Sequence, residues 1–318
     1  MGHDRELLIP EPLRPGDLVG VVAPCGPVEE GALVRGITFL ERLGFRVVQG
    51  DNCTRQRGYL AGHDRQRLEN LTGMLESPEI RAVLFARGGY GSMRILDGID
   101  CGAIRRDPKI LLGMSDATAL QLSLFARCGL VSLSGPMVAG QMAKGLDEPS
   151  ERSLVDALTL PFAGKDLVEA FAATARVIRH GRAEGLFLGG CLSLVTSLLG
   201  TAHVPDFSGA VLFLEDVNEP PYRLDRMFTH LKLAGVLDRI SGLVLGHFTG
   251  PRGIDVSPDA ERIARELTDT HPVPILAGFP FGHALPNLTL PCGVPVELDT
   301  DGPRLTVTVQ AGFRVKLH

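Results

Sequence analysis

The chain has 318 residues, of which 44% are hydrophobic and 22% are charged, and it contains no tryptophan. This apolar content can fill a sizeable core, which excludes a disordered chain, and the length fits one large domain or two ordinary ones. The formal net charge is −5 and the isoelectric point is about 6.0. A chain with this balance has no overall positive field to hold a polyanion, so we expect no nucleic-acid partner.

The amino-terminal segment Met1–Glu6 is polar, and no apolar stretch after it resembles the core of a signal peptide. No segment approaches the roughly 20 apolar residues that a membrane span needs. We therefore expect a cytoplasmic protein without a membrane partner. The six cysteines are widely spaced, with no C-x-x-C motif and no Cys/His cluster, so we expect no metal, no cofactor and no disulfide framework.

Strands and helices alternate through the first half of the chain. Apolar residues at helical spacing predict helices over residues 33–44 and 68–75, and a third helix is predicted over residues 117–126. Short apolar runs that end in turns predict strands at Leu18–Ala23, Phe45–Val48, Ala82–Ala86 and Ile110–Gly113. The alternation predicts an α/β fold with a doubly wound parallel sheet of the Rossmann or flavodoxin type.

The rhythm is lost in a stretch rich in glycine and proline, residues 145–180. We place a linker at residues 151–180, between an N-terminal α/β domain (residues 1–150) and a C-terminal domain (residues 181–318). Beyond the linker we predict helices at 192–199 and around Leu224–Leu231, with buried strands at 210–214 and 243–245. Short segments at 289–290, 294–298 and 305–309 look antiparallel, so this second domain is expected to be mixed α/β.

A serine lies where the fourth predicted strand turns into a helix. In Gly113-Met114-Ser115-Asp116-Ala117, a tight turn would raise the Ser115 hydroxyl above the sheet edge, beside amides at a helix N-terminus that favour negative charge. This is the geometry of a nucleophile elbow, although the pattern is G-x-S-x-A rather than G-x-S-x-G. The alternative is that Ser115 or Asp116 only caps the helix.

Acidic and histidine side chains lie at other strand ends. Glu215 and Asp216 end a buried strand, the place where sites form in open α/β sheets, and a carboxylate there can orient a histidine. The alternative is that the two carboxylates cap the helix that follows. His283, in a loop flanked by glycine and proline, and His247, after another strand, are equal candidates from their positions alone.

A glycine-rich turn, Arg87-Gly88-Gly89-Tyr90-Gly91, follows the third predicted strand. It lacks the G-x-G-x-x-G pattern and a Walker lysine, so it gives little support to nucleotide binding. Bare amides near a nucleophile are also what an oxyanion hole needs. Cys25 is a weaker nucleophile candidate, because no histidine is near it in sequence.

Together these segments resemble the LD-carboxypeptidase family, serine peptidases of murein recycling that also include the microcin C immunity peptidases. The resemblance runs through nearly the whole chain. It is carried by residues 21–27, 86–91, 113–116, 189–194, 214–216 with 221–226, and His283 with Asn287, Leu290 and Pro291. Cys25, Ser134 and Cys191 depart from residues that are usual in the family, and none of the three belongs to its triad.

The resemblance implies a Ser-Glu-His triad of Ser115, Glu215 and His283, and so favours His283 over His247 and Glu215 over Asp216. It implies an oxyanion hole made by backbone N–H groups of Asp116 and Gly89. Arg87, Tyr90 and Arg226 are candidates for substrate binding, since a substrate carboxylate needs a cation or a nest of amides.

The implied function is a serine carboxypeptidase that cuts the L,D-peptide bond of murein tetrapeptide and releases terminal D-Ala in peptidoglycan recycling. Family members are often dimers, so we expect a homodimer. The alternatives are a microcin C-type immunity peptidase that hydrolyses aminoacyl or peptidyl nucleotides, and a small-molecule binding protein without catalysis. The absence of tryptophan and the presence of only three tyrosines favour the murein branch, because a nucleobase is held by stacking on aromatic side chains.

Overall fold

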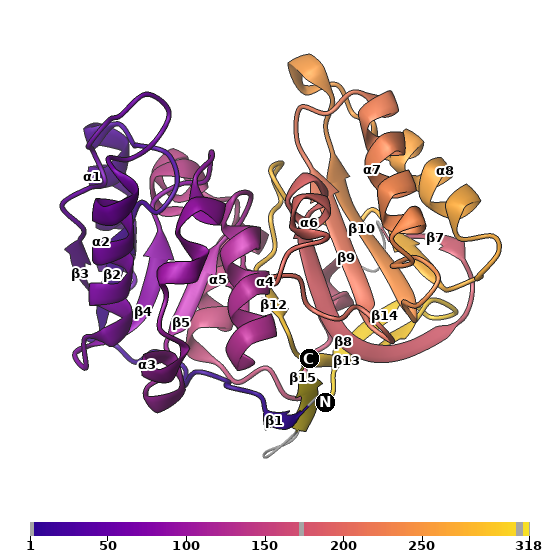
Figure 1. Cartoon of the computed structure of the whole chain (residues 1–318), viewed down its shortest axis with the longest axis horizontal. Coiled ribbons are helices and arrows are strands. Elements are labelled where there is room, and N and C mark those ends of the chain that lie inside the picture. Colours follow the sequence, from indigo (N-terminus) through magenta and orange to yellow (C-terminus); the bar gives the residue numbers. More distant parts are fainter. Residues whose placement is uncertain (1–2, 172–174, 310–313, 318) are drawn as a thin grey trace.

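Two β-sheets organise the chain, one in each half of the sequence, and they lie side by side with helices around them (Figure 1). The computed structural model describes residues 3–171, 175–309 and 314–317. The expected fold class is confirmed: the first sheet is doubly wound and almost entirely parallel, and the second sheet is mixed. No helix in the described ranges is long and apolar enough to cross a membrane.

The first sheet has six strands in the order β12-β6-β5-β4-β2-β3. Five are parallel, and β12 from the far end of the chain adds to the edge antiparallel to β6. Their bounds are β2 Leu18–Val22, β3 Arg46–Gln49, β4 Ile80–Phe85, β5 Ile110–Gly113, β6 Ser132–Ser134 and β12 Leu290–Cys292. The central strands are buried on both faces, as their apolar sequences predict.

Five helices cover the two faces of this sheet: α1 Glu30–Arg42, α2 Asp64–Glu76, α3 Cys101–Arg106, α4 Ala117–Cys128 and α5 Glu148–Thr159. Helices α1 and α5 contribute Leu40 and Leu158 to the core on one face. Helices α2, α3 and α4 pack on the other face, where their core continues into the second half. Residues 151–159, where the predicted linker begins, lie within the packed helix α5.

The second sheet has seven strands in the order β14-β13-β8-β9-β10-β11-β7. The four central strands are parallel to one another, and β13 and β7 flank them in the antiparallel direction. The edge strand β14 pairs antiparallel with β13. The strand bounds are β7 Arg176–Arg179, β8 Arg182–Cys191, β9 Val211–Asp216, β10 Gly242–Phe248, β11 Ile275–Ala277, β13 Pro295–Asp299 and β14 Arg304–Val307. Helices α6 Leu192–Leu198, α7 Pro221–Leu233 and α8 Ser257–Leu267 accompany this sheet.

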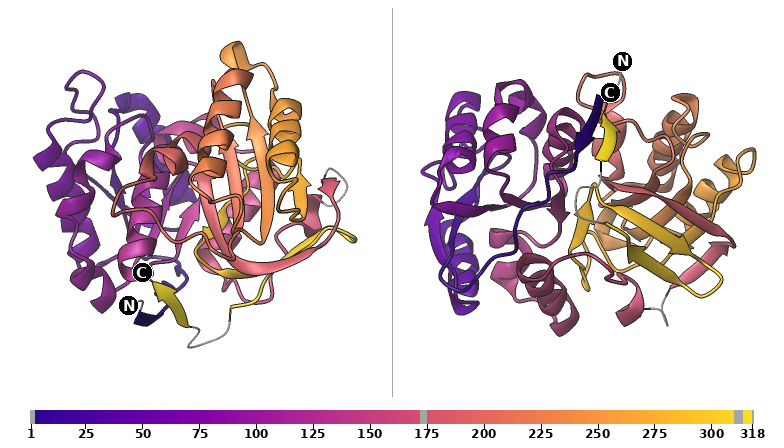
Figure 2. Two further views of the ribbon diagram at one scale, coloured as in Figure 1. Left: turned by 45° about the vertical axis from the view of Figure 1, so that its right-hand side comes forward. Right: turned by 90° about the horizontal axis from the view of Figure 1, so that it is seen from below.

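The two halves meet along α4, which contacts α6 and β8. The chain ends also meet, because β1 (His3–Glu6) pairs antiparallel with β15 (Arg314–Leu317) beside the junction (Figure 2). Since α4 begins just after Ser115, and β8 pairs with β9, which carries Glu215, this junction brings predicted site residues of both halves to one place.

Candidate active site

Ser115 lies in the sharp turn between β5 and α4. Its φ of 62° is in the left-handed region, which L side chains rarely adopt and which costs about 1–3 kcal/mol. The turn is held by the first bonds of the helix, from Ala117 N to Met114 O (3.2 Å) and from Thr118 N to Ser115 O (2.9 Å). The serine therefore occupies a strained strand-to-helix elbow at a helix N-terminus.

The glycine-rich turn after β4 lies directly against this serine. A β-carbon at Gly88 would come within 2.8 Å of Ser115 Cβ and 3.0 Å of Ser115 Oγ, so only glycine allows the approach. Within the described chain, the backbone amides of Gly88, Gly89 and Asp116 donate to no protein acceptor. Bare amides and a serine hydroxyl thus share one small volume, which is the arrangement that can hold a developing oxyanion.

Glu215 and His283 are in direct contact, although 68 positions separate them. Glu215 lies near the end of β9 and is 3% exposed, and its Oε2 is 2.7 Å from Nδ1 of His283. A carboxylate accepts only, so Nδ1 carries the proton and Nε2 is free to accept one. Burial alone lowers the pKa of His283, but the charge of Glu215 and this hydrogen bond outweigh burial and raise the pKa above its ordinary value.

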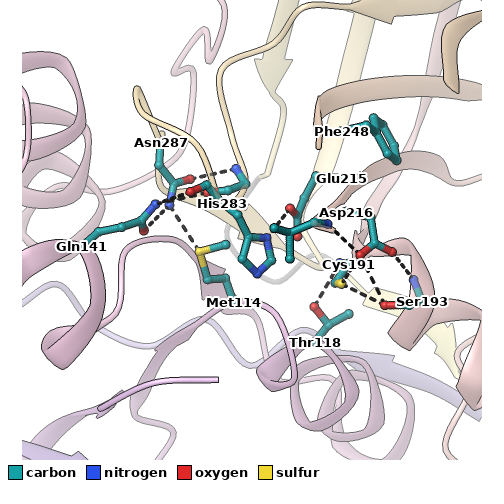
Figure 3. A network of polar contacts seen from close by, with 12 residues as sticks. Met114, Thr118, Gln141, Cys191, Ser193, Glu215, Asp216, Phe248, His283 and Asn287 are labelled. Carbon is teal, nitrogen blue, oxygen red and sulfur yellow. Dashed lines mark hydrogen bonds and ion pairs between the residues drawn. The ribbon is translucent and has the colours of Figure 1, made fainter. Parts of the chain in front are cut away.

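The loop that carries His283 is fixed by Asn287 and Gln141 (Figure 3). Asn287 Oδ1 accepts from Gly282 N (3.0 Å), while Asn287 Nδ2 donates to Gln141 Oε1 (2.8 Å) and contacts Met114 Sδ. Gly282 has a φ of +115°, and a β-carbon there would come within 2.6 Å of Glu215 Oε2. The residue before the histidine must therefore be glycine for the Glu215 carboxylate to reach the imidazole.

Asp216, the alternative carboxylate, faces away from the imidazole. It is buried and accepts hydrogen bonds from the amides of Ser193 and Val217, both 2.8 Å (Figure 3). Burial, and then the charge of Glu215, raise the pKa of Asp216 to about 6. Cys191 lies beside it, with Sγ 3.4 Å from Asp216 Oδ1. Asp216 thus anchors the start of α6 and the turn after β9.

His247, the alternative histidine, lies on β10 and does not line the cleft that holds Ser115. Its Nε2 is buried and has no hydrogen-bond partner among the described residues, and burial lowers the pKa of His247. Cys25, the alternative nucleophile, is completely buried, and burial followed by the charge of Asp116 raises the pKa of its thiol well above the ordinary value. Neither group is placed or poised to react in this cleft.

Ser115 and His283 line one cleft of about 690 Å³ between the two halves. In the described structure, Ser115 Oγ makes no hydrogen bond to the imidazole; such contacts are often loose before substrate binds. The other lining residues are Val28, Glu29, Ala32, Arg87, Gly88, Gly89, Met114, Met137, Ala139, Gly140, Gln141, Lys144, Val217 and Asn218. Asp116 lies under the cleft, with its carboxylate accepting from Ser92 N (2.8 Å).

Of the three predicted substrate contacts, only Arg87 lines this cleft. Tyr90 packs edge-on against Tyr59, and the Arg226 guanidinium lies over the ring of Tyr222. Lys144 and Gln141 also line the cleft, although neither was predicted as a site residue. No local pattern marks them, because they belong to the segment after β6 that reaches the cleft only in the folded chain.

The described residues contain no group of three or more His, Cys, Asp and Glu side chains that could hold a metal ion. All six cysteines are free thiols. The cleft brings together a hydroxyl, an imidazole with its carboxylate, and backbone amides.

Comparisons with known proteins match both halves of the chain. Residues 19–135 match the LD-carboxypeptidase N-terminal domain, and residues 184–298 match the LD-carboxypeptidase C-terminal domain. A probable murein peptide carboxypeptidase of Bacillus subtilis is 37% identical over 95% of this chain and 94% of the relative. A murein tetrapeptide carboxypeptidase of Pseudomonas aeruginosa is 32% identical over 88% of this chain and 92% of the relative.

The fold is also that of a relative with a solved structure. The microcin C7 self-immunity protein MccF of Escherichia coli is 28% identical over 95% of this chain and 96% of the relative. A structure of MccF in complex with glutamyl sulfamoyl guanosine superposes with a TM-score of 0.85 at 27% identity, covering 95% of this chain and 99% of that chain. With both domain matches and these relatives, the chain belongs to the LD-carboxypeptidase family, a family of peptidases.

Proposed function

We propose that this protein is a serine LD-carboxypeptidase that releases terminal D-Ala from murein tetrapeptide. The observation that carries the proposal is the strained Ser115 elbow in one cleft with His283, whose Nδ1 is bound to Glu215. The murein substrate is supported by the names of the relatives. The proposed setting is peptidoglycan recycling in the cytoplasm by a homodimer of this chain.

In the proposed reaction, His283 Nε2 accepts the Ser115 proton as Oγ attacks the scissile carbonyl carbon. The tetrahedral oxyanion accepts hydrogen bonds from Asp116 N and an amide of the Gly88–Gly89 turn. The C–N bond then breaks, and His283 returns the proton to the departing D-Ala nitrogen. Water, activated by the same imidazole, hydrolyses the acyl-enzyme and restores Ser115. Glu215 holds the ring and stabilises its positive charge throughout.

The lining of the cleft favours a peptide over a nucleotide. Within the described residues, no Phe, Tyr or Trp side chain lines it, whereas base stacking on an aromatic ring contributes roughly 1–3 kcal/mol. Phe171 lines a different cavity, beside α5. The alternative function, hydrolysis of aminoacyl nucleotides, has in its favour the close match to MccF.

The two functions are separated by one assay at equal substrate concentrations. We expect murein tetrapeptide to release free D-Ala. We expect kcat/KM for aminoacyl sulfamoyl adenylates to be about tenfold to a hundredfold lower than for the tetrapeptide, because the cleft lacks an aromatic platform on which the base could stack. A higher kcat/KM for the nucleotide-linked substrate would reverse the assignment of substrate. If neither substrate is cleaved and a fluorophosphonate probe does not label the protein, the results would favour a binding protein without catalysis.

A carboxypeptidase must also recognise a free terminal carboxylate, and Lys144 is suited to bind it. Only two cations, Arg87 and Lys144, are among the described cleft residues. Arg87 donates to Pro27 O (3.2 Å), whereas Lys144 has no acidic partner in the described chain. The one carboxylate in the lining, Glu29, accepts from the Gly31 and Ala32 amides at the start of α1 (2.7 Å each). The charge of Lys144 therefore remains available to a ligand.

We expect Lys144→Met to raise KM for a tetrapeptide acid about tenfold to a hundredfold, since a charge-assisted hydrogen bond contributes about 1.5–3 kcal/mol. KM for the matched C-terminal amide should change little, so the preference of the enzyme for the acid should disappear. The control is Lys165→Met, whose ammonium pairs with Asp156 in the other cavity (3.2 Å). A changed preference between diaminopimelate and lysine peptides instead would assign Lys144 to the diamino acid.

A further inference from the structure

Arg67, on α2, is a completely buried arginine in the first half of the molecule. Burying a guanidinium is costly unless its charge and N–H groups find partners. Its Nη1 donates to the carbonyl oxygens of Pro24 and Gly91 (2.8 Å for Gly91), and its Nη2 binds Asp64 Oδ1 (2.5 Å). One guanidinium thus joins α2 to two separate loops at the carboxyl ends of β2 and β4.

Those two loops form the floor beside Ser115. Gly91 ends the turn that begins at Gly88, and Pro24 precedes Gly26, whose amide donates to Gly88 O (3.1 Å). A β-carbon at Gly91 would come within 2.7 Å of Arg67 Nη1, so glycine is needed there for the guanidinium to reach the carbonyl. The Gly88–Gly91 turn is therefore held at one end by Gly26 and at the other by Arg67.

The segment after the turn is tied to the same anchor. Asp64 also accepts a two-pronged interaction from Arg94 (2.9 and 2.6 Å), and the Arg94 hydrogen bond, assisted by Arg67, lowers the pKa of Asp64 to about 2. Asp64 is therefore ionised at neutral pH. Ser92 then links this segment to the elbow, with its N bonding Asp116 Oδ2 (2.8 Å) and its Oγ bonding Asp116 O (2.6 Å).

We propose that Arg67 is a positioning residue for the oxyanion hole: its guanidinium fixes the Gly88–Gly91 turn so that the bare amides of this turn face Ser115. The inference rests on the proposed function only in that Ser115 is the nucleophile. The positioning role explains why the charged side chain of Arg67 is buried, since a neutral side chain cannot donate to two carbonyls and an aspartate together.

The test is Arg67→Lys, which keeps the charge but loses the planar fork that spans both carbonyls. Displacement of catalytic groups by about 1 Å can cost about a hundredfold in rate. We expect kcat to fall between about tenfold and a hundredfold, with KM within about twofold. The affinity for a peptidyl boronic acid, which forms a tetrahedral adduct with the serine, should fall by the same factor as kcat.

The matched control is Lys109→Met, because Lys109 is another buried cation of this half, 2% exposed and bound to Asp107 (2.5 Å). Lys109 precedes β5, at the opposite end of that strand from Ser115. We expect Lys109→Met to lower the thermal stability of the protein and to leave kcat unchanged. If Arg67→Lys does not fold, Asp64→Asn is measured in the same assays. This variant removes the carboxylate that binds the guanidinium but keeps Arg67 itself.

A folded Arg67→Lys enzyme with wild-type kcat, or one whose kcat falls without any loss of boronic acid affinity, overturns the proposal. The rate of Ser115 labelling by a fluorophosphonate separates this failure from failure of the proposed function. If the wild type is labelled but releases no D-Ala, the substrate assignment fails and Arg67 is judged by labelling alone. Equal labelling of wild type and Arg67→Lys rejects the role of Arg67 while the nucleophile stands.

Discussion

Replacing Ser115 by alanine is expected to lower kcat for D-Ala release by about a millionfold, because the hydroxyl is the proposed nucleophile and triad members act as a unit. His283→Ala should cost nearly as much, and the double variant should be little worse than either. The fold should remain, since one small polar group is removed from a turn held by backbone hydrogen bonds. Single-turnover kinetics and circular dichroism measure the two effects.

The chain offers a sharp control in a second serine bound to a histidine. Ser123 Oγ lies 2.9 Å from His203 Nδ1, and His203 Nε2 lies 3.1 Å from Asp97 Oδ1. Ser123 is buried inside α4 and does not line the cleft. Ser123→Ala should therefore keep its activity and its fluorophosphonate adduct. Retention of a tenth of wild-type activity by Ser115→Ala would show that the nucleophile is another residue.

Glu215→Gln is expected to lower kcat by about ten-thousandfold, the loss typical when a triad carboxylate becomes an amide of the same shape. The amide cannot compensate the positive charge that develops on the imidazole, and it no longer enforces the tautomer with the proton on Nδ1. The hydrogen bond of 2.7 Å and the burial of Glu215 make this contact sensitive to removal of the charge. The loss is measured with saturating tetrapeptide near neutral pH.

The same variant should move the pH profile in a defined direction. Glu215 raises the pKa of His283, and the imidazole acts as a base only when neutral, so wild-type kcat/KM rises as pH increases through that pKa. Without the carboxylate charge the pKa of His283 falls, so the acid limb should move to lower pH. Asp216→Asn is the control, since Asp216 contacts amides rather than the ring, and a shift as large as that of Glu215→Gln would contradict the assignment.

Much of the fold could be predicted from local pattern alone. Apolar runs followed by turns identified β2, β4, β5 and β9 almost to their ends, because strands buried on both faces leave continuous apolar sequence. Helix α5 was missed because Pro149 was interpreted as a breaker. In the structure, Asp147 caps the helix and Pro149 lies in its first turn, where a missing N–H costs nothing. Helix α8 carried a similar signal in Pro258 and was also missed.

The sheet that a strand joins could not be found from local sequence. A short antiparallel segment was predicted at 289–290 and assigned to the second domain, but β12 completes the first sheet, whose other strands lie more than 150 positions earlier in the chain. Pairing at that distance is decided by packing of the whole chain, not by the propensity of a tripeptide. The same holds for β1 and β15, which join the two ends.

The sequence by itself determined the α/β class and the places where chemistry is possible, because parallel strands bring their carboxyl ends to a common edge, with Ser115 and Glu215 just there. From position alone His247 and His283 were equal candidates, and only the family resemblance favoured His283. The tertiary structure decided the contact itself, because the loop fixed by Asn287 carries the His283 imidazole to Glu215. Lys144 and Arg67 were hidden for the same reason: a cation has no periodic signature, and its role depends on neighbours that are remote in sequence and come together only when both halves fold.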